Sequence, residues 1–177
     1  LYAIRVLGLG PALVGLTVAM GGVGGFLGAL LTERLARRFG VGVTILGAMV
    51  LDSAVGFLIP LAGGPVLVAT AMLMTCQLLG DACLTVYEIN VVSVRQAMTP
   101  DRLLGRVNAS MHIVEAGVGP LGALIGGLLG GFIGIRPTVW IATLGGLLGV
   151  LWLFLSPLAH IKELPSSEEA AATSYLG

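Results

Sequence analysis

The stretch PALVGLTVAMGGVGGFLGALLTERLARR, residues 11–38, decides the class of this protein. A long uncharged run ends in one acid, Glu33, and three arginines, Arg34, Arg37 and Arg38. Four more charge-free runs follow it: Arg38 to Asp52, Asp52 to Asp81, Glu115 to Arg136 and Arg136 to Lys162. About 20 apolar residues suffice to cross a hydrocarbon core as a helix. Charged residues make up 10% of the chain, against about 25% in soluble domains. The sequence therefore predicts an all-α integral membrane protein whose surroundings are the lipid bilayer.

The apolar runs predict five transmembrane helices, and their connections predict an orientation. Seven of the nine basic residues fall on the first and third connections and the tail, whereas Arg5 and Arg136 fall on the other side. The positive-inside rule makes the seven-residue side cytoplasmic. We expect a multi-pass protein of the cell membrane, inner or plasma, with a cytoplasmic C-terminus. The predicted spans are Pro11–Thr32, Val41–Ile59, Val66–Val91, Arg106–Phe132 and Thr138–Pro157.

The two ends of the chain carry separate expectations. Residues 1–10 are apolar up to Arg5 and are typical of the outer end of a truncated preceding helix with an external loop. The five-helix transmembrane region covers residues 11–159. Residues 160–177, which contain Pro, Ser and Glu, predict a disordered cytoplasmic tail. We therefore expect the chain to be a fragment of a larger protein.

Several function classes are disfavoured by composition and spacing. A net charge of zero leaves no basic stripe for nucleic acid. Cys76 and Cys83 have neither zinc-ligand nor redox-motif spacing, so we expect inert buried thiols. His112 and His160 lie too far apart in sequence to argue for a metal. We expect no cofactor, no metal site and no enzyme, because no nucleophile motif or phosphate-binding loop is present.

The third span carries the strongest functional pattern. Gln77, Asp81, Thr85 and Glu88 share one helical stripe. Ionisable groups inside a membrane normally face the bundle interior or a watery cavity. We expect this stripe to line a polar cavity, with carboxylates satisfied purely for packing as the alternative. Glu88 lies about 10 Å from Arg95 along the helix, so interfacial placement or pairing with Arg95 remains open.

The fourth span has a face that is polar toward its start and lined by glycine farther along. Its members repeat at 4-3-4-3-4 spacing: Asn108, His112, Glu115, Gly119, Gly122 and Gly126. Glycine lets another backbone approach closely, so helix packing is expected of Gly119, Gly122 and Gly126, with Pro120 loosening the helix. Glu115, about 14 Å in from Arg106, is too deep to reach the interface easily. It joins Asp81 as a leading candidate.

Glycines also share a face of the first span, and the second span holds one acid. Gly21, Gly25 and Gly28 are expected to pack helices, with Gly24 on a similar face. Asp52 is isolated in sequence, since Ser53 and Gly56 are its nearest small or polar neighbours.

The connection Glu33-Arg34-Leu35-Ala36-Arg37-Arg38 resembles the acid-Arg-x-Gly-basic-basic motif of the major facilitator superfamily. Ala36 stands where the second glycine is usual, and Ala29 occupies the first glycine position. A second stretch, from Asn90 to Val107 and on to Gly127, is similar to helices ten and eleven, with their connecting loop, in the drug- and siderophore-exporter branch. The resemblance covers the chain from Leu1 to about Lys162.

This resemblance implies that the chain corresponds to helices eight to twelve in the C-terminal half of a 12-helix transporter, whose N-terminal half would be its partner. In that family helices seven, eight, ten and eleven line the central cavity. This favours Gln77, Asp81, Glu88, His112 and Glu115 as the substrate and proton pathway and places Asp52 on a peripheral helix. The motif residues Glu33, Arg34, Arg37 and Arg38 would form a cytoplasmic gate, the alternative being charges that only set topology.

The function expected from these residues is secondary active transport, as proton-coupled efflux of a small, partly hydrophobic compound. A carboxylate in a low-dielectric cavity can exchange a proton near neutral pH, and alternating access can couple that exchange to export. Asp81 or Glu115 would carry the proton. A non-transporting membrane scaffold or sensor, and an inactive truncated product, are the alternatives.

Overall fold

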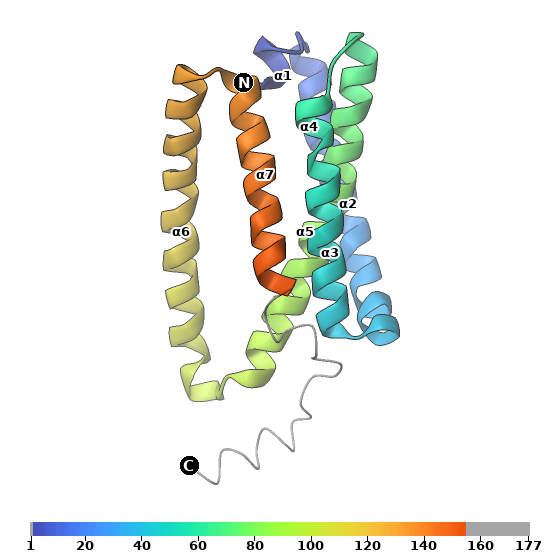
Figure 1. Cartoon of the computed structure of the whole chain (residues 1–177). Coiled ribbons are helices and arrows are strands. Elements are labelled where there is room, and N and C mark those ends of the chain that lie inside the picture. Colours follow the sequence, from blue (N-terminus) through green and yellow to red (C-terminus); the bar gives the residue numbers. More distant parts are fainter. Residues whose placement is uncertain (1, 155–177) are drawn as a thin grey trace.

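The structure, a computed structural model, describes residues 2–154 except for the side chains of residues 101, 115, 153 and 154. Its described part consists of helices joined by short turns, and two of the helices are only four residues long (Figure 1). Five helical stretches are long and apolar enough to span a membrane, as the sequence predicts. The helices are α1 (Tyr2–Arg5), α2 (Pro11–Phe39), α3 (Val41–Gly56), α4 (Leu58–Leu61), α5 (Val66–Met98), α6 (Asp101–Phe132) and α7 (Ile135–Phe154).

The helices continue farther than the apolar runs that predicted them. The expected connections at residues 33–40 and 92–105 are wrong in extent, because α2 includes all three motif arginines and α5 runs on to Met98. Arginine and glutamate are good helix formers, so the edge of the apolar run does not end the helix. Gly40, at a φ of 84°, ends α2, since a positive φ suits glycine. Thr99 is extended before Pro100 and ends α5.

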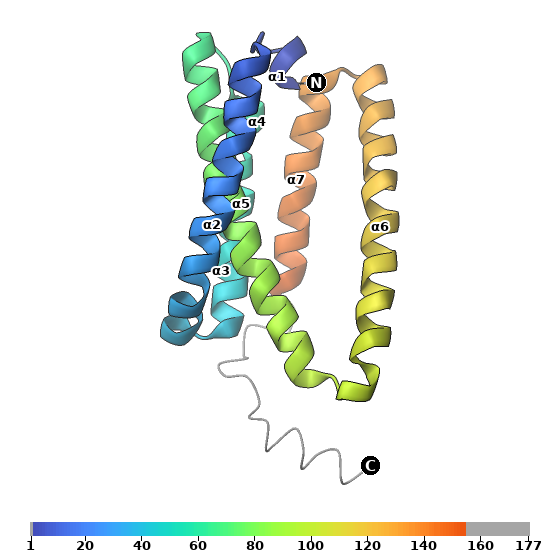
Figure 2. The same cartoon turned by 180° about the vertical axis from the view of Figure 1, so that it is seen from behind.

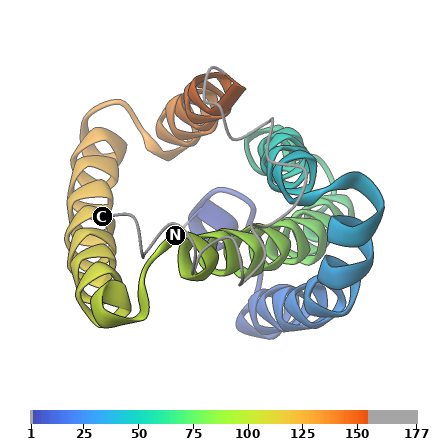
Figure 3. The ribbon, with the colours of Figure 1, turned by 90° about the horizontal axis from the view of Figure 1, so that it is seen from below.

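Helix α5 is the centre of the bundle. It packs most extensively on α2 and next on α3. Viewed from below, α5 lies between α2 and α3, α7 lies beyond α3, and α6 lies at the far side of α7 (Figure 3). Helix α6 contacts α7, and a view from behind shows it standing apart from α2 and α3 (Figure 2). The chain thus forms a packed group of three helices extended by an α6–α7 pair.

The turns fall at the two ends of the bundle in the alternation that the arginines predict. The turn at Gly40 and the turn at Thr99 lie together at one end, hereafter the arginine-rich end (Figure 1). Helices α1 and α4 and the turn at Gly134 lie at the other. Residues 2–10 form α1 and the link to α2 at this second end. The predicted tail, residues 160–177, lies outside the described residues.

The second end is held by hydrogen bonds to the buried carbonyl of Ala62. Tyr2 donates its hydroxyl to the Ala62 oxygen at 3.1 Å, and Arg136 Nη2 donates to the same oxygen at 3.5 Å. Arg136 Nε donates to the Pro60 oxygen at 3.3 Å. Leu9, Ala62 and Leu73 form a small apolar core beneath. These contacts connect the start of α7 to the α4–α5 turn.

Apolar side chains cover the outside of the bundle, as a bilayer requires. Leu67, Phe132 and Trp152 are each more than three-quarters exposed. Exposed apolar area on this scale marks contact with a membrane or with other protein rather than with water. The described bundle therefore places its polar groups at the ends and along a few internal contacts.

Candidate functional site between α2, α3 and α5

The predicted polar stripe of α5 is organised around Asp81. Gln77 Nε2 donates a hydrogen bond of 2.9 Å to Asp81 Oδ2, one helical turn away. Thr85 directs its hydroxyl to the main-chain oxygen of Asp81 at 2.8 Å, so the threonine does not bind the carboxylate. Asp81, Gln77 and Thr85 are half-buried, whereas Glu88 is exposed. The stripe is therefore one hydrogen-bonded pair with a separate acid nearer the arginine-rich end.

Helix α2 meets this stripe through its glycines. A Cβ on Gly21 would overlap Asp81 Oδ2 and come within 3.0 Å of the Gln77 side chain. A Cβ on Gly25 would lie 3.3 Å from Thr85 Oγ1. The missing side chain at Gly21 thus makes room for the carboxylate at the contact between two helices. The Asp81 group lies against α2, and its role in lining a cavity stays a prediction.

Two further glycines of α2 bring its backbone against that of α5. A Cβ on Gly24 would overlap the carbonyl of Leu78, and one on Gly28 would overlap the carbonyl of Ala82. Such overlap with main-chain atoms cannot be relieved by turning a side chain. The close approach of α2 and α5 therefore depends on glycine at these positions, and it fixes where Asp81 lies relative to α2.

Asp52 of α3 is the functional candidate that sequence reasoning did not select. Its Oδ1 lies 3.3 Å from the position that a Cβ on Gly80 would take. The Asp52 carboxylate interacts electrostatically with that of Asp81. Asp52 has no acidic neighbour along its own helix, so the helical spacing of acidic residues could not identify it as a candidate. The signal that exists is Gly80 beside Asp81, which leaves room for a group from a neighbouring helix.

Only part of the polar face of α6 contacts another helix in the described part of the chain. Arg95 Nη1 of α5 donates to Asn108 Oδ1 at 3.5 Å, which links the two helices near the arginine-rich end. Arg95 is thus joined to Asn108 rather than to Glu88 in the contacts that the described residues show. His112 is exposed. The side chain of Glu115 lies outside the described residues, so its role stays a prediction.

The glycine face of α6 faces open space in the described part of the chain. A Cβ on Gly119, Gly122 or Gly126 would meet no heavy atom within 4 Å. Pro120 lies inside the helix, as predicted from the sequence. Helix packing through these residues stays a prediction.

The motif arginines occupy the last turns of α2. Arg37 Nη1 pairs with Glu33 Oε1 at 3.3 Å, and both side chains are more than 70% exposed. The Arg38 guanidinium lies 5.4 Å from the centre of the Phe39 ring. Arg34 is exposed. In this arrangement the contacts of Glu33, Arg37 and Arg38 are made within their own helix, and a gating role stays a prediction.

Between residues 2 and 154, no group of three or more His, Cys, Asp or Glu side chains is arranged to hold a metal ion. Cys76 and Cys83 are buried free thiols on α5. The arrangement places the Asp81 carboxylate at the contact between α2 and α5.

Comparison with known proteins gives one match. The family model of the Major Facilitator Superfamily matches residues 1–176. Searches of curated proteins and of solved structures found no match.

Proposed function

Because this chain belongs to the major facilitator superfamily of membrane transporters, we propose that it works in secondary transport as a proton-coupled exporter. The proposed cargo is a small, partly hydrophobic compound. The resemblance of residues 90–127 to the drug- and siderophore-exporter branch supports this cargo and direction.

The observation that carries the proposal is the position of the Asp81 carboxylate. It accepts a hydrogen bond from Gln77, lies against Gly21 of α2, and interacts electrostatically with Asp52 of α3. One ionisable group therefore touches or influences three helices. A charged carboxylate can only accept hydrogen bonds, whereas a protonated one can also donate.

Protonation of Asp81 would change how these helices fit together. It would change the electrostatic interaction with Asp52 and the hydrogen bonding beside Gly21, where the Asp81 and Gln77 side chains leave no space for a Cβ. A ligand or proton shifts a conformational equilibrium when it favours one arrangement over another. Proton uptake at Asp81 would in this way bias the orientation of the transporter, and substrate would favour the opposite orientation.

We further propose that the arginine-rich end is cytoplasmic and that the protein lies in the cell membrane. The two basic turns share this end, which agrees with the positive-inside rule. The exposed glycine face of α6 would pack against the partner half of the same transporter, where close backbone approach is favourable.

Transport by the full-length protein in proteoliposomes tests the proposal. We expect wild-type protein to move ethidium, a hydrophobic cation, when a pH gradient is imposed. Asp81→Asn should abolish gradient-driven movement while dye exchange without a gradient persists, because the neutral amide cannot exchange the proton. Glu115→Gln tests the second candidate in the same assay.

The matched control is Gln96→Ala, which removes an exposed polar side chain from the same helix. It should retain gradient-driven transport. Normal coupling in Asp81→Asn, with the protein correctly inserted, would contradict the assignment of Asp81. Loss of dye exchange as well as coupling would show a structural defect and would also count against it.

A further inference from the structure

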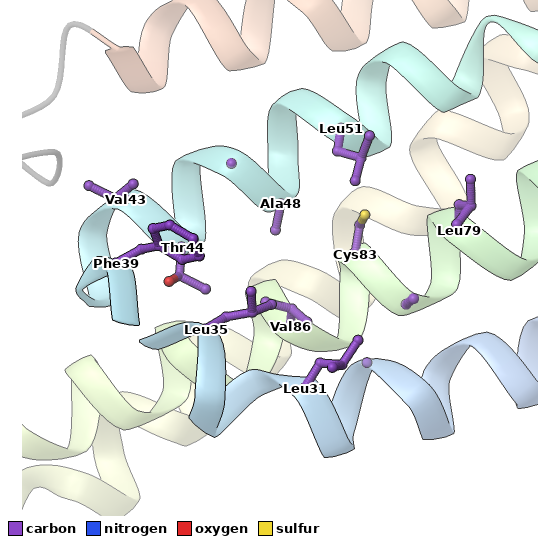
Figure 4. A pocket seen from close by; sticks show the side chains of 13 residues that line it. Leu31, Leu35, Phe39, Val43, Thr44, Ala48, Leu51, Leu79, Cys83 and Val86 are labelled. Carbon is purple, nitrogen blue, oxygen red and sulfur yellow. The ribbon is translucent and has the colours of Figure 1, made fainter. Parts of the chain in front are cut away.

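A groove of about 390 Å³ lies between α2, α3 and α5, and Asp81 is not among the residues that line it (Figure 4). Its walls are apolar, with Leu31 and Leu35 on α2, Val43 and Leu51 on α3, and Val86 on α5. Thr44 also lines it, but its hydroxyl donates to the Gly40 oxygen at 2.8 Å. The groove therefore presents hydrocarbon surface and suits an apolar occupant.

The groove follows α3 and is open on one side. On α3 it runs from Val43 to Leu51, and Phe39, the last residue of α2, lies at the Val43 end (Figure 4). The eight residue steps on α3 correspond to about 12 Å along a helix, most of one leaflet of a hydrocarbon core that is about 30 Å thick. Leu31, Val43 and Leu51 are each 44–50% exposed, so the groove opens toward the bilayer. A Cβ on Gly47 would meet nothing within 4 Å, which leaves its floor free.

The size of the groove favours a single extended chain over a helix. A helix of the same length, about 10 Å across, would fill roughly 900 Å³. The groove, at about 390 Å³, holds less than half of that volume. A lipid acyl chain is apolar, unbranched and present at high concentration on this side of the protein.

One end of the groove carries positive charge. Phe39 lines that end, and the Arg38 guanidinium lies over its ring, 5.4 Å from the centroid. Arg37 is paired with Glu33, whereas stacking on a ring leaves the edge donors of Arg38 available for an acceptor. Guanidinium groups bind phosphate through paired hydrogen bonds. The apolar groove thus leads to a phosphate-binding group at the depth of the headgroups.

From this juxtaposition we propose that the α2–α3–α5 groove binds one phospholipid with an anionic headgroup. Its acyl chain lies along Gly47 between Leu31, Val43 and Leu51. Its headgroup phosphate contacts Arg38. Asp81 does not line the groove, and lipid binding there does not depend on transport.

Lipid retention by the full-length protein, measured by native mass spectrometry, tests the site. The purified protein is titrated with phosphatidylglycerol and, separately, with zwitterionic phosphatidylethanolamine. Gly47→Leu fills the groove floor and should reduce retention of both lipids at least tenfold. Arg38→Gln should reduce phosphatidylglycerol retention by about fivefold, which corresponds to about 1 kcal/mol for one basic residue near an anionic surface. Phosphatidylethanolamine retention should fall less, because its ammonium group offsets the charge of its phosphate.

Matched variants control for bulk and for charge. Gly145→Leu adds the same side chain to α7, where a Cβ also meets nothing within 4 Å. Arg102→Gln removes an exposed arginine of α6 from the same end of the bundle. Both should retain lipid as the wild type does. Val43→Phe blocks the groove from an exposed wall position and repeats the test if Gly47→Leu does not insert.

Three results would overturn the proposal. Wild-type retention in both Gly47→Leu and Val43→Phe would show that the groove is not the lipid site. Equal losses in Arg38→Gln and Arg102→Gln would show general surface charge rather than a headgroup site. Displacement of phosphatidylglycerol from wild-type protein by ethidium would assign the groove to a hydrophobic substrate instead.

Discussion

Helices α2 and α6 carry similar glycine patterns but have opposite surroundings. On α2, Gly21, Gly24 and Gly28 press against atoms of α5. On α6, Gly119, Gly122 and Gly126 meet nothing within 4 Å among the described residues. Spacings of three and four residues put each set on one face of its helix. The pattern therefore specifies a smooth face, while the rest of the chain decides what covers it.

The difference also separates two kinds of close contact within α2. Gly24 and Gly28 approach main-chain carbonyls of α5, which cannot move without the helix. Gly21 approaches the end of the Asp81 side chain, which can rotate. The first kind sets the distance between helices, and the second sets the space available to an ionisable group. The following four experiments test this distinction, beginning with the largest expected effect.

Gly24→Ala should destabilise the protein most. Its methyl group would overlap the Leu78 carbonyl, and overpacking of this kind costs about 1–3 kcal/mol. Unfolding in nanodiscs, followed by circular dichroism, gives the change in free energy. Gly122→Ala on α6 is the control and should be neutral or stabilising, because alanine favours helix over glycine. Equal destabilisation by both substitutions would remove the contrast between the two helices.

Arg136→Gln should loosen the α6–α7 pair from the packed group. The guanidinium bonds to Pro60 and Ala62 are long, so their loss should cost about 1–2 kcal/mol. Spin labels on α2 and α7 would report a broader distance distribution in the variant. Arg5→Gln, an exposed arginine at the same end, should leave the distribution unchanged. An unaltered distribution in Arg136→Gln would show that α7 is held by apolar packing alone.

Gly21→Ala should cost less, about 1 kcal/mol, because the Asp81 side chain can turn away from the added methyl group. The cost should largely vanish when Asp81 is replaced by alanine. A double-mutant cycle on unfolding free energies measures this coupling. The parallel cycle of Gly24→Ala with Asp81→Ala should show simple additivity, since Gly24 meets Leu78 instead. Additivity in both cycles would contradict the distinction between the two kinds of contact.

Arg37→Gln should have the smallest effect, no more than about 0.5 kcal/mol. Its pair with Glu33 is exposed to solvent and lies within one helix, where ion pairs contribute little. The same unfolding measurement applies, with Arg34→Gln as the control. A loss well above 1 kcal/mol in Arg37→Gln alone would indicate a buried contact for this residue in the folded transporter.

The fold was largely predictable because membrane spans follow from uninterrupted apolar length. The five spans follow from that rule. Because each span crosses the bundle once, alternate turns also lie at the same end of the bundle. Helix ends did not follow, because Arg34 to Arg38 and residues 92–98 continue a helix beyond the apolar run. The glycine at residue 40 and the proline at residue 100, not the charges, end α2 and α5.

The candidate site was predictable within one helix and not between helices. The pairing of Gln77 with Asp81 follows from their spacing on α5, since residues four apart are neighbours on a helix surface. The approach of Asp52 to Gly80 depends on how α3 packs on α5. Periodicity along one helix holds no information about that packing. Asp52, a single acid with no acidic neighbour on its own helix, was therefore not selected from the sequence as a pathway residue.

The hydroxyl groups of the helices have a consequence for how the protein is made. Each serine and threonine hydroxyl bond in the described residues runs to the carbonyl four residues earlier, for example from Thr32 to Gly28 and from Thr70 to Val66. The buried amide of Asn90 likewise donates to Val86. A helix that satisfies these groups by itself carries little unmet polarity into lipid. Each span can therefore enter the bilayer during synthesis before its neighbours arrive, and assembly can follow as a later step.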